Sequence, residues 1–155
     1  MTDIAFLEAA LLVLFIGTLI WCTVEDVRRR VIPHSATAAV VGLYIVYAAA
    51  GYSDPLSGIA AGALYLLIGF VLFQLNLLGG GDAKLIAAVA LWAGLDGALP
   101  LAFYVTMAGG VVALGVLITH RIRVHADGSA KNTVATVPYG MAIAVGGSFV
   151  ALGGV

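Results

Sequence analysis

The chain is poor in cysteine, proline and charge. It has one cysteine, four prolines and 10% charged residues among 155. Its single cysteine, Cys22, cannot form an internal disulfide, and the three histidines show no ligand-like spacing for a metal. Seven lysines and arginines are too few to form the extended basic patch of a nucleic-acid-binding domain. We therefore expect no metal site, no cofactor and no nucleic-acid partner.

Apolar residues, in contrast, are abundant and make up 63% of the chain. A soluble domain of this size could not bury so much apolar surface, so the composition predicts a protein surrounded by the lipid bilayer. At roughly 20 residues per membrane span, the length accommodates about six helices and no separate soluble domain. We predict an all-α, polytopic membrane helix bundle that forms a single domain over residues 1–155.

Six apolar runs give the expected helices, and short breaks rich in glycine, proline or charge separate them. The runs are Ile4–Val24, Ala36–Tyr52, Leu56–Leu78, Ala83–Leu95, Ala98–Thr119 and Val134–Val155, and His120–Thr133 is the longest polar loop. The fourth run gives roughly 20 Å of helix against roughly 30 Å of hydrocarbon, so it is too short to cross comfortably. Either Gly79–Asp82 is drawn in from one side of the membrane, or the Asp96-Gly97 turn dips in from the other. The first alternative would place Asp82 in a recessed, protein-lined pocket.

Charge is distributed unequally over the breaks. All basic residues lie at the first, third and fifth breaks: Arg28, Arg29, Arg30, Lys84, Arg121, Arg123 and Lys131. The opposite side carries only acidic residues: Asp3, Glu8, Asp54 and Asp96. By the positive-inside rule, the three basic breaks face the cytoplasm and both termini lie outside.

Two acidic residues, Asp26 and Asp82, end up on this cytoplasmic face. Asp26 lies at the end of the first expected helix and Asp82 precedes the fourth, so the chain crosses out and back between them. Ionisable groups beside a membrane are costly and indicate function. When two carboxyl groups share a site, like-charge repulsion raises one pKa, so one group stays protonated while the other is ionised. Such a pair can hydrolyse a peptide without a metal or a covalent intermediate.

Each aspartate also has a structural interpretation. Asp26 could form a juxtamembrane ion pair with Arg29 or Arg30, and Glu25 beside it is interpreted as a solvated charge. Asp82, after three glycines and before a helix, is a good N-cap. Two carboxylates could instead bind a cation in a small transporter, although such sites are expected on broken helices near the bilayer midplane.

The residues around both aspartates resemble known motifs. Asp26-Val-Arg-Arg-Arg-Val31-Ile32-Pro33 resembles the aspartate-basic-Ile-Pro motif of type IV prepilin peptidases. Gly79-Gly80-Gly81-Asp82-Ala83-Lys84 matches the G-x-G-D motif that these enzymes share with presenilin-type intramembrane aspartyl proteases. Pro138-Tyr139-Gly140 is similar to the closing segment of the family.

The resemblance implies that Asp26 and Asp82 are the catalytic pair. The other matching positions would shape the site: Ile32, Pro33, Gly79, Gly80, Gly81, Lys84, Pro138, Tyr139 and Gly140. The implied activity is an aspartyl endopeptidase of the bacterial inner membrane. Its substrates would be prepilins or pseudopilins, whose short basic leader is cut after a glycine on the cytoplasmic side.

Two departures from the family pattern refine this expectation. The chain lacks the cysteine-rich segment of larger members, so it resembles the short, peptidase-only type of Flp (tight-adherence) pilus systems, and N-methyltransferase activity is not expected. His34 stands where members commonly have Asn, and a role for it near the pair stays open. The alternatives are a small cation-coupled transporter and a non-catalytic pilus-assembly protein, and a homo-oligomer is compatible with the sequence.

Overall fold

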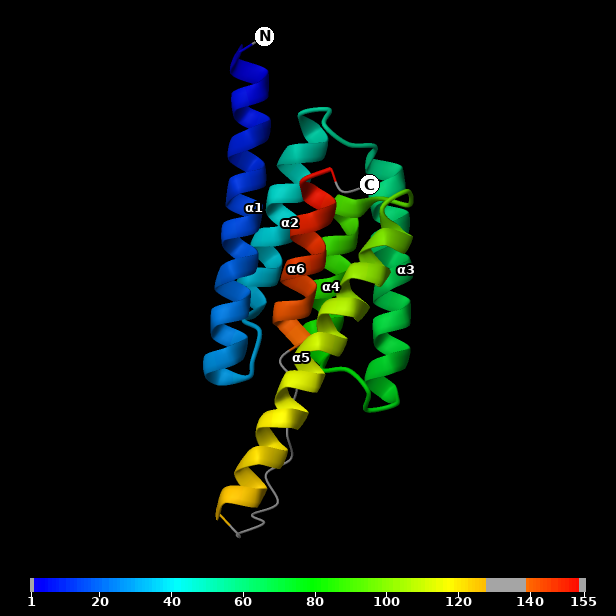
Figure 1. Cartoon of the computed structure of the whole chain (residues 1–155). Helices are drawn as coiled ribbons and strands as arrows, with labels where there is room; N and C mark the ends of the chain where they lie inside the picture. Colours follow the sequence, from blue (N-terminus) through cyan, green and yellow to red (C-terminus); the bar gives the residue numbers. More distant parts are fainter. Residues whose placement is uncertain (1, 128–138, 154–155) are drawn as a thin grey trace.

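The computed structural model of the protein is a bundle of six helices, and it describes residues 2–127 and 139–153 (Figure 1). The helices are α1 (Thr2–Arg29), α2 (His34–Ala49), α3 (Pro55–Gln74), α4 (Gly80–Ala93), α5 (Ala98–Asp127) and α6 (Tyr139–Ala151). Each predicted apolar run contains one helix, and the described residues contain no strand. The predicted all-α membrane bundle is therefore confirmed.

The helices alternate in direction and in length. α1, α3 and α5 run toward one end of the bundle, which we call the site end, and α2, α4 and α6 run back from it (Figure 1). The helices that approach the site end have 28, 20 and 30 residues, whereas those that return have 16, 14 and 13. By length and composition, Ile4–Arg29, Pro55–Gln74 and Ala98–Thr119 are able to cross a membrane. The sequence predicted that only the fourth helix would be short, whereas three of the described helices, α2, α4 and α6, are short.

α4 occupies the centre of the bundle, because it contacts α2, α3, α5 and α6. Its buried face is built largely from alanine, so neighbouring helices can approach closely. On α3, a Cβ added at Gly58 would lie 2.7 Å from the Leu91 carbonyl oxygen, and one at Gly62 would lie 2.6 Å from Leu91 Cδ2. Gly58 and Gly62, four residues apart on α3, therefore lie at a close helix contact, in which any larger side chain would force α3 and α4 apart.

The segment before α4 turns back into the bundle. α3 ends before Asn76, which adopts a left-handed conformation with φ 57°, so the third helix is shorter than the predicted run to Leu78. The chain then re-enters the bundle before α4 begins (Figure 1). At the opposite end, the Leu95 N–H donates to Ser57 Oγ over 2.9 Å, so α4 finishes level with the start of α3. This arrangement favours the first alternative, in which Gly79–Asp82 is drawn inward.

α5 continues beyond the predicted helix end at Thr119. The expected loop over residues 120–133 was wrong in its first part, because the helix extends to Asp127. Residues 120–127 contain neither glycine nor proline, so the helix has no stop signal where its apolar character ends. The rest of this expected loop, including Lys131, lies outside the described residues.

Candidate active site

Asp26 lies on the buried face of α1. The residues of this face recur every three or four positions, as helical periodicity requires: Leu11, Phe15, Leu19, Cys22 and Asp26. Asp26 is 7% exposed, and no other charged side chain among the described residues is buried to this degree. Helix periodicity therefore directs a carboxylate into the protein at the last turn of an otherwise apolar helix face.

The arginines after Asp26 are arranged differently from the predicted ion pair. Arg29 pairs with Glu25, with 3.1 Å between Nε and Oε2, so this arginine has Glu25 and not Asp26 as its ion-pair partner. Arg30 ends α1 in a left-handed conformation with φ 54°, and its N–H donates to the Asp26 carbonyl oxygen over 2.8 Å. The Arg30 charge also interacts electrostatically with the Asp26 side chain. Arg29 is thus paired with Glu25, whereas Arg30 lies near Asp26.

Asp82 lies in the first turn of α4, but it is not the N-cap. Gly79 occupies the N-cap position, so Asp82 is the third helical residue. Its carboxylate interacts electrostatically with the Gly79 backbone N–H at the start of the helix. The Oδ1 atom of Asp82 is buried and has no hydrogen-bond partner within the part of the chain that the structure describes. An unpartnered buried oxygen is costly, and it indicates a group retained for chemistry.

The two carboxyl groups meet at the site end. Asp26 and Asp82 interact electrostatically, although they are separated by two helices in the sequence. Asp82 precedes the apolar part of α4 and lies outside the three helices that are able to cross the membrane. Burial, together with the charge of Asp26, raises the pKa of Asp82 to about 6. The pair therefore retains a proton to a higher pH than an isolated carboxyl group would.

α6 completes the site from the opposite end of the sequence. The backbone N–H of Gly140 donates to Asp26 Oδ2 over 2.9 Å. Gly140 is buried and Tyr139 is half-buried, whereas Pro138 lies outside the described residues. The sequence indicated this segment only through its resemblance to a family motif. No sequence signal predicted that its contribution is a backbone N–H.

The remaining motif residues differ in how closely they approach the pair. Ile32 is buried, and a Cβ added at Gly81 would lie 3.3 Å from its Cβ, so the start of α4 packs on the α1–α2 connection. Pro33 is the N-cap residue of α2. Lys84 and His34 have exposed side chains, so burial does not direct either of them toward the pair.

One neighbour of the glycine segment was missed by the sequence analysis. A Cβ added at Gly80 would lie 3.3 Å from Cε2 of Phe73, whose ring covers the start of α4. Phe73 belongs to an unbroken apolar run, and nothing in the sequence distinguishes it from its neighbours.

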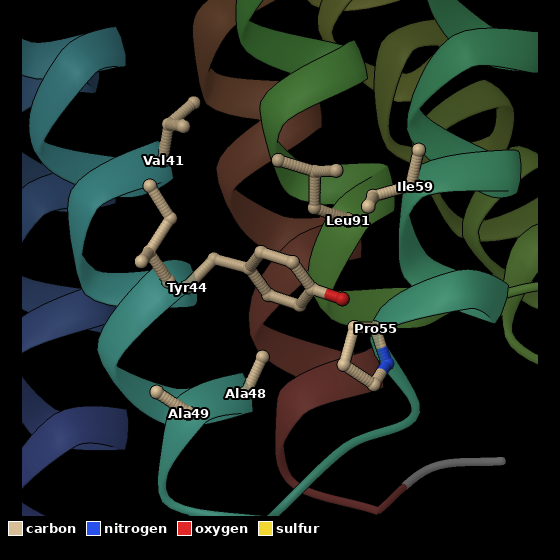
Figure 2. Close-up of a pocket in the computed structure, with 8 residues that line it drawn as sticks. Val41, Tyr44, Ala48, Ala49, Pro55, Ile59 and Leu91 are labelled. Atoms are coloured by element: carbon tan, nitrogen blue, oxygen red, sulfur yellow. The ribbon is translucent and has the colours of Figure 1, made fainter.

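An apolar pocket lies away from the carboxylates. It has a volume of about 360 Å³ and is lined by residues of α2, α3 and Leu91 of α4 (Figure 2). Tyr44 projects from α2 toward Pro55 and Leu91 in this view, and its hydroxyl is buried without a hydrogen-bond partner in the described part of the chain. The pocket contains neither Asp26 nor Asp82 and no charged side chain. We therefore assign the chemistry to the carboxylate pair.

The described residues contain no group of three or more His, Cys, Asp or Glu side chains placed to hold a metal ion. What the site does provide is two carboxyl groups that interact electrostatically, of which Asp26 accepts a hydrogen bond from a backbone N–H. Such a pair can take a proton from water and give one to a carbonyl oxygen.

A comparison with protein families gives one match. The sequence model of the type IV leader peptidase family matches residues 13–114, a range that contains both Asp26 and Asp82 and ends before α6. No curated protein and no solved structure matches the chain.

Proposed function

The chain belongs to the type IV leader peptidase family, and from that premise we propose that it is a membrane-embedded aspartyl endopeptidase with Asp26 and Asp82 as its catalytic pair. One observation carries the proposal. Two carboxyl groups from distant helices adjoin each other, one almost fully buried and the other with a buried oxygen that lacks a partner. A purely structural pair of acidic residues would be repulsive and would be expected to acquire compensating partners.

The surroundings of the two carboxyl groups favour different roles. Asp26 accepts a hydrogen bond from the Gly140 N–H and lies near the charge of Arg30, and both contacts stabilise a carboxylate against the cost of its burial. The unpartnered Oδ1 of Asp82 favours the protonated form, which can donate a hydrogen bond. We therefore assign Asp26 as the general base and Asp82 as the general acid.

The reaction then needs only water and the two carboxyl groups. Asp26 takes a proton from water while the water oxygen bonds to the scissile carbonyl carbon, and Asp82 gives its proton to the carbonyl oxygen. In the resulting diol, one hydroxyl returns a proton to Asp82 as the carbonyl re-forms. The carbon–nitrogen bond breaks, and the leaving amine takes the proton from Asp26. Both groups end in their starting states.

The substrate and orientation follow from the family and from charge. The first and third breaks and the end of α5 share the site end (Figure 1), which therefore carries Arg28, Arg29, Arg30, Lys84 and Arg121. By the positive-inside rule, the site end faces the cytoplasm of a bacterial inner membrane. We propose that a prepilin or pseudopilin leader is cut there after a glycine. The resemblance to the Flp-pilus type favours a peptidase that does not N-methylate the product.

The test is a cleavage assay with a co-expressed prepilin, followed by the size change when the leader is lost. We expect Asp26→Asn and Asp82→Asn each to lower the cleavage rate by about 10²–10⁴-fold, because each removes a proton-transfer group. Asp96→Asn is the matched control, because Asp96 is an exposed aspartate at the opposite end of the bundle. All variants should insert into the membrane in equal amounts.

Three results would contradict the proposal. Full processing by either active-site variant would remove that aspartate from the mechanism. Pilus assembly that continues in both variants without cleavage would indicate a scaffold. Cation flux in proteoliposomes that is lost with either aspartate, in a wild type that does not cleave, would indicate a transporter.

A further inference from the structure

Gly140, on α6, contacts Asp26, the general base of the proposed reaction. Its backbone N–H donates to Asp26 Oδ2 in a buried hydrogen bond between residues 114 positions apart. Gly140 lies in the first turn of α6 as the structure describes it, where backbone N–H groups have no partner within the helix. The same helix end carries a partial positive charge that favours an anion. This N–H group is therefore available to hold a carboxylate.

The missing side chain of Gly140 is as important as its N–H. A Cβ added at this position would lie 2.7 Å from Asp26 Oδ2 and 3.1 Å from the Asp26 Cβ and Cγ. These distances are shorter than ordinary van der Waals contacts. The space that a side chain would occupy is therefore filled by the Asp26 carboxylate itself.

Other glycines of α6 are crowded for a different reason. A Cβ at Gly146 would lie 2.6 Å from Val105 Cγ2 on α5, and one at Gly147 would lie 2.7 Å from Val89 Cγ1 on α4. These two glycines allow helices to pack closely, whereas Gly140 contacts a functional group. The contrast makes it possible to separate a positioning role from a packing role within one helix.

Asp82 is held in a similar way. Its carboxylate interacts electrostatically with the Gly79 N–H, and a Cβ at Gly79 would lie 2.7 Å from Asp82 Oδ2. Each carboxyl group thus lies against a glycine whose missing side chain leaves room for it. For Asp82 this glycine precedes the same helix, whereas for Asp26 it comes from the far end of the chain and donates a hydrogen bond.

We propose that Gly140 is a positioning residue of the peptidase: its N–H fixes Oδ2 of Asp26, and the absence of a side chain allows the carboxylate to face the attacking water through Oδ1. The inference rests on the proposed function, since it assigns a role within that reaction. It also accounts for the contribution of a segment that lies beyond the matched range of residues 13–114. Gly140 itself touches no reacting atom and acts through Asp26.

The first test compares Gly140→Ala with two glycine variants. We expect Gly140→Ala to lower kcat by about a hundredfold, with KM within about twofold of wild type, because a small displacement of a catalytic group has effects of that size. Gly146→Ala introduces an equally close contact in the same helix and should lower the thermal midpoint with kcat retained per folded molecule. Gly110→Ala, where nothing lies within 4 Å of the new Cβ, should behave as wild type.

The second test does not depend on activity and remains informative if Gly140→Ala folds poorly. Asp26→Ala removes Oδ2 and Cγ, two of the three atoms that the new Cβ would meet, and retains only the Asp26 Cβ at 3.1 Å, so it should restore part of the thermal midpoint lost in Gly140→Ala. Additive losses in the double variant would overturn the proposed contact. Equal kcat in Gly140→Ala and wild type would overturn the positioning role while leaving the peptidase assignment intact. Failure of the wild type to cleave, with the coupling still present, would instead count against the proposed function.

Discussion

The contacts at the two ends of the bundle differ in kind. At the site end, Asp26 accepts a hydrogen bond from the Gly140 backbone N–H, and one buried oxygen of Asp82 has no partner in the described residues. Away from it, α1, α2 and α4 are joined by aromatic rings centred on Trp92. The ring centroids of Phe15 and Tyr47 lie 4.3 Å and 4.9 Å from that of Trp92.

The comparison teaches where stability and reactivity reside. Stacked rings bury a large apolar area in well-defined geometry, so the aromatic cluster of Phe15, Tyr44, Tyr47, Tyr52 and Trp92 supports the bundle. The acidic pair adds like-charge repulsion and a buried oxygen without a hydrogen bond. Both lower the stability of the fold, but they suit proton transfer. If this division is correct, substitutions at the two ends should separate the unfolding midpoint from the cleavage rate.

The largest effect on stability is expected from Trp92→Ala. The substitution removes three ring contacts and the hydrogen bond from Nε1 to the Val40 carbonyl oxygen, so we expect a loss of about 3 kcal/mol in unfolding free energy. The cleavage rate per folded molecule should stay within about twofold of wild type. Unfolding in detergent micelles and a cleavage assay on the same preparation measure both quantities.

Trp21→Ala is the matched control for that variant. Trp21 is 44% exposed on the surface of α1, so its removal should have a much smaller effect. A large fall in the cleavage rate of folded Trp92→Ala protein would contradict the division between the two ends.

The second prediction concerns pH and applies to the site end alone. Asp82 has a pKa of about 6, so the proton that the general acid must donate is progressively lost as the pH rises above that value. We expect the cleavage rate to fall about tenfold between about pH 7 and about pH 8. Initial rates of wild-type protein in detergent across this range provide the measurement. A rate that is flat or rising over the same interval would contradict the assignment of Asp82 as the acid.

The smallest expected effect is that of Tyr65→Phe. The Tyr65 hydroxyl donates to the carbonyl oxygen of Ala98 and ties the middle of α3 to the start of α5. Its loss should cost about 1 kcal/mol of stability and leave the cleavage rate unchanged. Tyr104→Phe retains the ring that stacks on Phe149 and serves as the control. Equal unfolding midpoints for both variants would show that the Tyr65 hydrogen bond adds no stability.

Much of the fold could be predicted because hydrophobicity and turn chemistry act locally. Each of the six apolar runs overlaps one helix, and the short breaks between the runs contain the turns. The joint placement of Asp26 and Asp82 also follows from counting crossings between them. These features depend on neighbours in sequence, or on one helix face, and require no knowledge of tertiary contacts.

The remaining features depend on partners that the sequence does not identify. Asp82 was interpreted as an N-cap, but Gly79 takes that position and moves the carboxylate into the first turn. Arg29 was considered a partner for Asp26, yet Glu25 is the closer acid on its helix face. The hydrogen bond from Gly140 could not be predicted, because every residue except proline has a backbone N–H.

That last feature has a consequence for how such a site tolerates variation. Since Asp26 is held by a main-chain N–H and Asp82 lies against the backbone of Gly79, the chemical identity of surrounding side chains can change without removing these contacts. A mutational screen that follows only polar residues would therefore pass over the supports of the site. The positions that matter would be revealed by intolerance to the smallest possible addition, a single methyl group at Gly79 or Gly140.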